Sequence, residues 1–217
     1  MSSNHPPYLD PYLRAARQHG AGFQSLLWAS PQTQEARFAA LVRLCDFAGR
    51  RVLDAGCGRA DLYDYLLRKR MRPAHYVGLE AVPDLAAAAR AKPHCDYQIV
   101  NADFVREPHR LLAGADLVVF CGSLNTLDTD RFYATLRTAL SATGRTLLFN
   151  FLSSPHLAGA PWLTWHRPEA VLAYVTQFGD AAILDDYTPG DCTIRVETAG
   201  GQASGPAAGS PRPHSPG

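Results

Sequence analysis

From Arg50 onward, short apolar runs alternate with segments whose apolar residues recur at helical spacing. The apolar runs predict strands at 50–55, 74–81, 96–103, 115–122, 145–152, 181–187 and 192–198. The segments between them predict helices at 60–70, 84–91, 128–140 and 167–178, and a short helix or turn at 107–113. Strands separated by helix-length segments favour an α/β fold, with a mostly parallel sheet and helices on both faces.

The last two predicted strands are separated only by a short stretch that contains TPGD, which is typical of a turn. We therefore expect them to form an antiparallel hairpin at one edge of the sheet. Before residue 50, the pattern predicts helices at 11–19 and 32–48. Ser30 and Pro31 suit the N-cap and first position of the second helix, on which Phe38, Leu41, Val42, Cys45 and Phe47 recur near one face.

The composition is that of an ordinary globular chain, with 47% hydrophobic and 19% charged residues and a net charge of +1. A net charge so close to zero provides no general electrostatic attraction for nucleic acid or a membrane surface, so neither is an expected partner. No apolar run approaches the length of a membrane span. The five cysteines are far apart and form no CxxC pair, so we expect no metal site and a reduced, cytoplasmic setting.

One glycine-containing stretch, VLDAGCGRADL at residues 52–62, predicts a ligand-binding turn between a strand and a helix. Asp61 stands where a dinucleotide-binding GxGxxG pattern needs its third glycine, and the phosphate-loop pattern is absent. The loop instead reads DxGxG, with the Asp54 carboxylate at the strand tip. A carboxylate there suits a cationic group and repels a pyrophosphate, so the expected ligand is a nucleoside that bears an amine.

The next two strands also end in acidic residues. VGLEA places Glu80 where it can accept hydrogen bonds from both hydroxyls of a ribose. NADF places Asp103 where it can accept from the amine of adenine. Because ligands bind beyond the carboxyl ends of parallel strands, we expect the three carboxylates to share one site.

These motifs resemble those of class I S-adenosylmethionine-dependent methyltransferases: VLDAGCGRADL their first motif, VGLEA their second, NADF their third and ADLVVFCGSLNTL their fourth. The resemblance covers roughly residues 40 to 198. It implies a Rossmann-like sheet of seven strands in the order 3-2-1-4-5-7-6. It also implies S-adenosylmethionine as cofactor, a binding core at 49–198 and N-terminal segments at 1–48 that cap the site. Residues 199–217 are rich in Gly, Pro, Ala and Ser, and we expect a disordered tail.

The resemblance further implies individual roles. Asp54, Gly56 and Gly58 are expected around the methionine part, and Glu80 on the ribose. Ala81 and Val82 are expected against adenine, with Asp103 and the Phe104 backbone at its amino edge. Cys121 and Gly122 are expected to close the site beside the reactive methyl. The stretch Arg59–Ala60–Asp61 departs from the small, neutral continuation of many members and leaves the contacts of Asp61 open.

The acceptor is expected to be a small molecule, methylated by direct transfer. The fourth motif lacks the [DN]PP[YF] sequence of enzymes that methylate amino groups of bases or glutamine. The acceptor-binding segments are expected to be the N-terminal arm, with Tyr8, Tyr12, His19, Phe23 and Trp28, and the insert after the fifth strand, with His156, Trp162, Trp165 and His166. The catalytic group is unassigned. His156 and His166 are candidate bases, and Arg14, Arg17 and Arg167 are candidate contacts of an acidic acceptor.

Three alternatives stay open at this point. The chain could methylate RNA or protein, although the near-neutral charge disfavours both. It could bind S-adenosylmethionine as a non-catalytic sensor, because the motifs indicate binding and do not by themselves establish transfer. Cys57 and Cys121 are expected to pack in the loop and the pocket wall, and the alternative is a redox pair.

Overall fold

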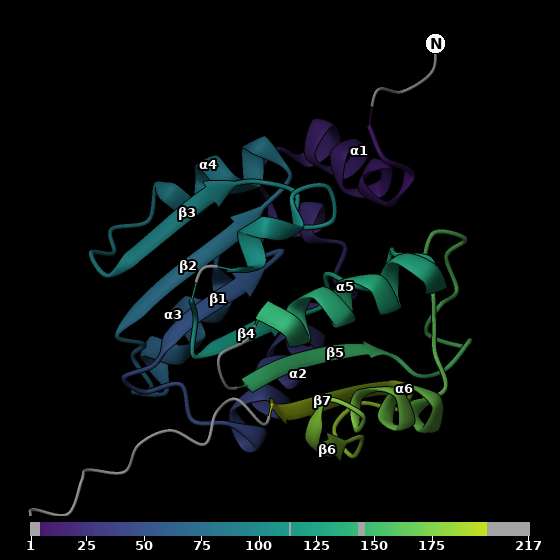
Figure 1. Cartoon of the computed structure of the whole chain (residues 1–217). Helices are drawn as coiled ribbons and strands as arrows, with labels where there is room; N and C mark the ends of the chain where they lie inside the picture. The colour runs from purple at the N-terminus through teal and green to yellow at the C-terminus, as the bar shows by residue number, and fades with distance from the viewer. Residues whose placement is uncertain (1–4, 113, 143–145, 199–217) are drawn as a thin grey trace, which may run out of the picture.

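A seven-stranded sheet in the order β3-β2-β1-β4-β5-β7-β6 organises the chain, as a computed structural model shows (Figure 1). The structure describes residues 5–112, 114–142 and 146–198. β1 to β5 run parallel, and β7 pairs antiparallel with both β5 and β6. The strands are β1 (Arg51–Ala55), β2 (His75–Glu80), β3 (Tyr97–Asn101), β4 (Leu117–Phe120), β5 (Thr146–Leu152), β6 (Gly179–Leu184) and β7 (Asp191–Thr198). The predicted strand order and the edge hairpin are confirmed.

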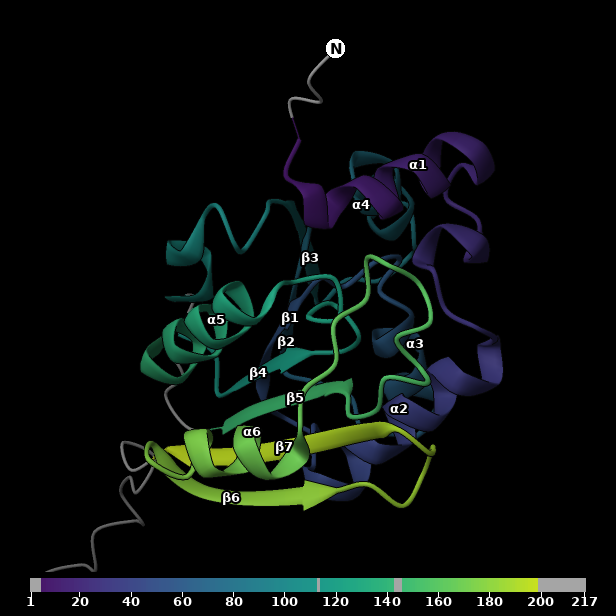
Figure 2. The same cartoon turned by 90° about the vertical axis from the view of Figure 1, so that its right-hand side faces the viewer.

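Helices cover both faces of this sheet (Figures 1 and 2). The α-helices are α1 (Asp10–His19), α2 (Pro31–Leu44), α3 (Asp61–Arg68), α4 (Pro83–Arg90), α5 (Thr129–Ala142) and α6 (Pro168–Val175). Short 3₁₀ segments occur at Pro7–Leu9, Phe23–Leu26 and Pro108–Leu112. Apart from ends that shift by a few residues, the six α-helices and the segment at Pro108–Leu112 match the prediction, whereas the 3₁₀ segments at Pro7–Leu9 and Phe23–Leu26 were not predicted.

Alternate residues of each central strand enter two separate cores. Leu53 on β1 packs with Phe132 of α5 and Val171 of α6 in one core. Its neighbour Val52 packs on the opposite face, in a core with Leu41 of α2. Both strand residues are at most 1% exposed, which is why the parallel strands read as continuous apolar runs.

The second predicted helix ends four residues early, so the expected extension to residue 48 is wrong. Cys45 has extended backbone angles, with φ −154° and ψ 140°. The Asp46 carboxylate then accepts a hydrogen bond from the Ala48 amide at 2.9 Å, and Gly49 turns the chain with φ +68°. Phe47 nevertheless enters the core from this turn, which accounts for its apparent helical spacing.

The N-terminal segment lies across the end of the sheet where the parallel strands finish (Figure 2). Ala16 of α1 packs on Val82 and Leu85, which follow β2. Within the described residues, none of the helices is both long and apolar enough to cross a membrane. The expected tail at 199–217 lies outside the described residues.

The start of α2 provides a stability test. The Ser30 hydroxyl accepts from the Thr33 amide at 3.1 Å, and the Thr33 hydroxyl accepts from the Ser30 amide at 3.1 Å. Ser30→Ala removes this reciprocal cap and should lower the free energy of unfolding by about 1 kcal/mol in urea titrations. Ser141→Ala, on the exposed face of α5, is the matched control and should change it by less than about 0.5 kcal/mol. Equal effects of the two substitutions would contradict the capping role.

Candidate functional site

A cavity of about 280 Å³ lies beyond the carboxyl ends of β1, β2 and β4. It is the place where an open parallel sheet binds ligands. All ten predicted cofactor residues line it, namely Asp54, Gly56, Gly58, Glu80, Ala81, Val82, Asp103, Phe104, Cys121 and Gly122. The fold thus gathers residues from four strand ends into one site.

The Asp54 carboxylate is buried at the floor of this cavity, and it is only 2% exposed. Its Oδ2 accepts a hydrogen bond from the Tyr76 hydroxyl, whereas Oδ1 is buried without a partner among the described residues. Burial raises the pKa of Asp54 to about 7, and the nearby Glu80 adds to this rise. A buried carboxylate with a free oxygen is suited to a ligand that brings a donor or a positive charge.

The Glu80 carboxylate joins the two loops that follow β1 and β2. Its Oε2 accepts from the Gly58 amide at 2.8 Å, and its Oε1 accepts from the Val82 amide at 2.7 Å. Burial raises the pKa of Glu80 to about 7, against the opposing effect of these amides. Each oxygen keeps a second lone pair that can accept a hydrogen bond from a ligand hydroxyl.

Asp103 is already engaged on both oxygens. The Val105 amide donates to Oδ1 at 2.9 Å, and the Tyr8 hydroxyl donates to Oδ2 at 2.7 Å. The second bond ties the N-terminal arm to the third strand end. The sequence did not indicate this contact, because the two residues lie 95 positions apart.

Two glycines of the loop are required by close packing as well as by backbone angle. Gly56 has φ +82°, and a Cβ there would lie 2.3 Å from the Ser123 side chain. Gly58 has φ +57°, and a Cβ there would lie 2.7 Å from Leu26 of the arm. A side chain at either position would therefore be strained and would also clash.

Asp61, whose contacts the sequence left open, forms a local ion network. It pairs with Arg59 at 3.0 Å and with Lys92 at 3.0 Å. These two cations lower the pKa of the carboxyl against the effect of its burial. Asp61 therefore lines the cavity as a neutralised group, unlike Asp54.

The two buried cysteines fit a packing role better than a redox role. Burial raises the pKa of Cys57 well above its usual value and that of Cys121 to about 12. Thiolate chemistry needs the opposite shift. Cys121 instead accepts a weak hydrogen bond from the Asn150 side chain at 3.5 Å.

The N-terminal arm and the insert after β5 line the rest of the cavity. Tyr8, Tyr12 and Trp28 come from the arm, and Trp162 and Leu163 from the insert. The insert is held by the Thr164 amide, which donates to the Asn125 carbonyl at 2.8 Å. Four of the aromatic residues expected near the acceptor therefore do line the cavity.

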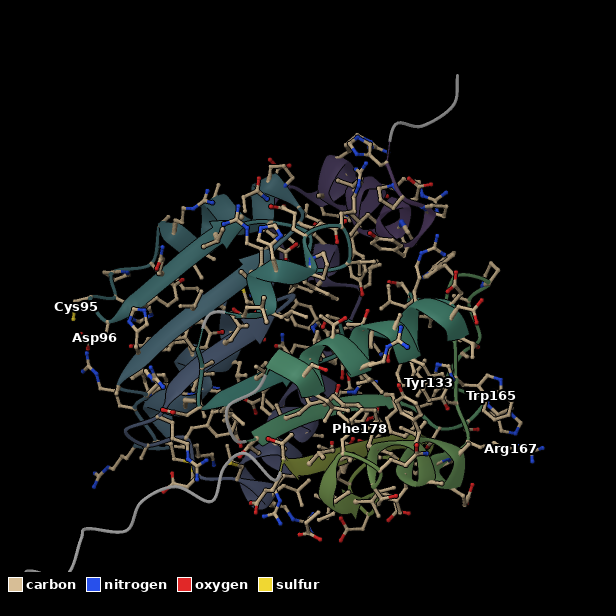
Figure 3. All side chains as sticks on the ribbon, in the orientation of Figure 1. Cys95, Asp96, Tyr133, Trp165, Arg167 and Phe178 are labelled. Atoms are coloured by element: carbon tan, nitrogen blue, oxygen red, sulfur yellow. The ribbon has the colours of Figure 1, made fainter. Side chains whose placement is uncertain are left out.

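The candidate histidine bases are not among the lining residues. His156 is exposed. His166 is buried and stacks on Phe132 with ring centroids 3.9 Å apart, and burial lowers its pKa. Its neighbours Trp165 and Arg167 lie at the outer edge of the molecule (Figure 3). His19, Phe23, Arg14 and Arg17 are not lining residues either.

Two polar residues that line the cavity were not predicted from the sequence. Arg37 of α2 is the only basic side chain among the described residues that line the cavity. Asn125, in the loop after β4, is 7% exposed, and its Oδ1 is buried without a partner in the described part of the chain. Both are ordinary polar residues in the sequence, and only their placement distinguishes them.

The comparisons with known proteins agree with this architecture. Residues 53–146 match a family model described as a methyltransferase domain. A search among curated proteins finds no match.

Solved structures with the same fold are similar over most of the chain. One is magnesium protoporphyrin IX methyltransferase from Synechocystis PCC 6803 with bound SAH, at 16% identity and a TM-score of 0.60, covering 88% of this chain and 94% of that one. Another is the N-methyltransferase NodS from Bradyrhizobium japonicum WM9 in complex with S-adenosyl-L-homocysteine, at 16% identity and a TM-score of 0.63, covering 89% and 100%. A complex of DhpI with SAM and HEP has a TM-score of 0.64 at 16% identity, covering 89% and 99%.

The raised pKa of Asp54 makes stability depend on pH in the ligand-free protein. The folded state holds the Asp54 proton up to about pH 7, whereas the unfolded chain loses it near pH 4. The contribution of this group is therefore complete below pH 4 and is lost as the pH rises through 7. Asp54→Asn should remove this loss, on the order of 1 kcal/mol per pH unit between pH 5 and 7, in urea titrations.

The comparison that isolates Asp54 is the difference between wild type and variant at each pH. Asp186→Asn provides the control, because Asp186 is an exposed residue paired with Arg43. Parallel curves for wild type and Asp54→Asn would contradict a raised pKa at this position.

Proposed function

We propose that the chain, whose residues 53–146 match a methyltransferase domain, is a class I S-adenosylmethionine-dependent methyltransferase that transfers a methyl group to a small-molecule acceptor by direct displacement. The observation that carries the proposal is the set of side chains that line the cavity. Acidic strand ends line one part of it, and aromatic side chains of the arm and the insert line another. Mostly apolar walls with a few polar groups are typical of small-molecule sites.

The cofactor, S-adenosylmethionine, supplies a methyl group that its sulfonium already activates. In the proposed arrangement, Glu80 accepts from the ribose hydroxyls with the lone pairs that the two backbone amides leave free. Asp54 accepts from the ammonium group through its unpartnered Oδ1. Ala81 and Val82 lie against adenine, with Asp103 and the Phe104 backbone at its amino edge. Gly56, Gly58, Cys121 and Gly122 surround the methionine part.

The protein contributes mainly alignment to this reaction. The acceptor atom must approach the methyl carbon in line with the breaking carbon–sulfur bond, and holding that geometry supplies much of the rate. Tyr12, Trp28 and Trp162 provide the walls that restrict the acceptor. The proposal assigns no proton transfer to His156 or His166, because neither lines the cavity.

The proposed division of the chain follows from these contacts. Residues 1–48 are proposed to cap the site, of which 1–4 lie outside the described residues, and residues 49–198 are proposed to form the core that binds the cofactor. Within the cap, the Tyr8 hydroxyl contacts Asp103, and Leu26 and Trp28 lie against Gly58 and Gly122. We place the enzyme in the cytoplasm because its five cysteines are free thiols, which suits a reducing compartment.

A small-molecule acceptor is favoured over RNA or protein. The net charge of +1 provides little general attraction for nucleic acid. Side chains of the arm and the insert line the cavity, and mostly apolar walls of this kind suit a small organic acceptor. One structural neighbour acts on magnesium protoporphyrin IX, as its name states.

The second candidate function, a non-catalytic sensor, uses the same binding site and differs from the enzyme only in that it transfers no methyl group.

Binding of the demethylated cofactor tests the proposed ribose contact. Glu80→Gln removes the charge and half of the acceptors, so we expect calorimetry to measure about 10- to 100-fold weaker binding of S-adenosylhomocysteine. Glu107→Gln, which alters a surface ion pair with Arg110, is the control and should bind as the wild type does. Unchanged affinity in Glu80→Gln would refute the ribose role.

Methyl transfer separates an enzyme from a sensor. The protein is incubated with S-adenosylmethionine carrying a labelled methyl group and with a small-molecule extract. We expect label in a compound of low molecular mass, because a cavity with mostly apolar, aromatic walls suits small acceptors. Label that appears only in protein or RNA of an unfractionated extract would overturn the small-molecule acceptor. Tight binding without any transfer would favour the sensor.

A further inference from the structure

The charged side chains that line the cavity are mostly acidic, whereas the methionine part of the proposed cofactor carries one positive and one negative charge. Four carboxylates line the cavity, of which Asp61 is paired with two cations outside the lining, whereas Asp54, Glu80 and Asp103 have no cationic partner in the described part of the chain. Arg37 is the only basic lining group among the described residues. The methionine part carries an ammonium and a carboxylate on the same carbon atom. Placing the ammonium near Asp54 therefore brings the carboxylate close to buried negative charge, which costs free energy unless a cation compensates it.

Arg37 is fixed in the position that such compensation requires. Its Nε donates to Oδ2 of Asp191 at 2.6 Å, and its Nη2 pairs with the same oxygen. The guanidinium also lies over the Trp28 ring, 4.8 Å from the centroid. The side chain is 12% exposed, so its orientation is set by these contacts and little ordering remains to be done when a ligand binds.

The third nitrogen of the guanidinium is left for a ligand. Nη1 has no hydrogen-bond partner within the part of the chain that the structure describes, and it lies 3.2 Å from where a Cβ would stand at Gly122. Gly122 lines the cavity beside Cys121. Gln34, one turn before Arg37 on α2, also lines the cavity and is 8% exposed. The same face of α2 thus presents an amide and a guanidinium to the cavity.

We propose that Arg37 binds the carboxylate of the methionine part of S-adenosylmethionine through its free Nη1, with Asp191 as the group that positions it. The inference rests on the proposed function, because it assigns a residue to one end of that cofactor. A guanidinium held on one side by a buried carboxylate can still donate to a second carboxylate from its remaining nitrogen. The competing assignment is an anionic group on the acceptor, and it makes a different prediction for cofactor binding.

The test compares S-adenosylmethionine with its decarboxylated analogue, which differs only by the missing carboxylate. We expect wild-type protein to bind S-adenosylmethionine about 10- to 100-fold more tightly in calorimetry. In Arg37→Gln this preference should fall below about threefold, because the affinity for the carboxylate form decreases while the affinity for the analogue stays. Arg43→Gln, an exposed position on the same helix, should keep the wild-type preference.

A second variant controls for the buried charge that Arg37→Gln leaves on Asp191. The double variant Arg37→Gln, Asp191→Asn removes both charges and should lose the preference in the same way. Retained preference in either variant, or equal weakening of both ligands, would overturn the assignment and leave Arg37 a structural residue or an acceptor contact. Failure of wild-type protein to bind either ligand would instead contradict the proposed cofactor, and the inference with it.

Discussion

The Glu80 carboxylate is the group on which the geometry of the site depends. It accepts one hydrogen bond from a backbone amide of the glycine loop after β1 and another from a backbone amide of the turn into α4. These two turns come from different βα units, and the Gly56 and Cys57 amides, which donate to the Leu79 carbonyl at 2.8 and 2.9 Å, also join the first turn to β2. A buried carboxylate that bonds to both makes the ligand-facing loops one rigid unit, at the cost of keeping a charge in a poorly solvated place.

Burial of acidic groups is tolerated at this edge because the site is a cavity that a ligand can fill. Asp54 and Glu80 both have pKa values raised to about 7 in the ligand-free protein. Such groups lower stability at neutral pH, and a cationic or donor-rich ligand recovers the loss when it binds. The buried carboxylates that lower the stability of the ligand-free protein therefore favour the binding of an adenosyl amino acid, which carries an ammonium group, over that of a phosphate-bearing nucleotide.

The second half of the site is made by segments outside the central sheet. The arm contributes Tyr8 and Trp28, and α2 contributes Arg37, which reaches the start of β7 through Asp191. These contacts link distant parts of the chain around the cavity. In the proposed arrangement cofactor and acceptor lie against the same side chains, so a substitution in the arm is expected to alter the binding of both.

The sequence by itself determined the sheet and the acidic strand ends. Apolar runs and helical spacing repeat along the chain, and parallel strands bring their carboxyl ends together, so Asp54, Glu80 and Asp103 were predictable as a group. The end of α2 was not predictable, because Phe47 continues the apolar spacing after the helix has ended. Only the tertiary structure placed Arg37 in the cavity and kept His166 out of it. Arg37 and Asp191 lie 154 positions apart, and their pairing depends on how α2 packs against the sheet, which no local pattern encodes.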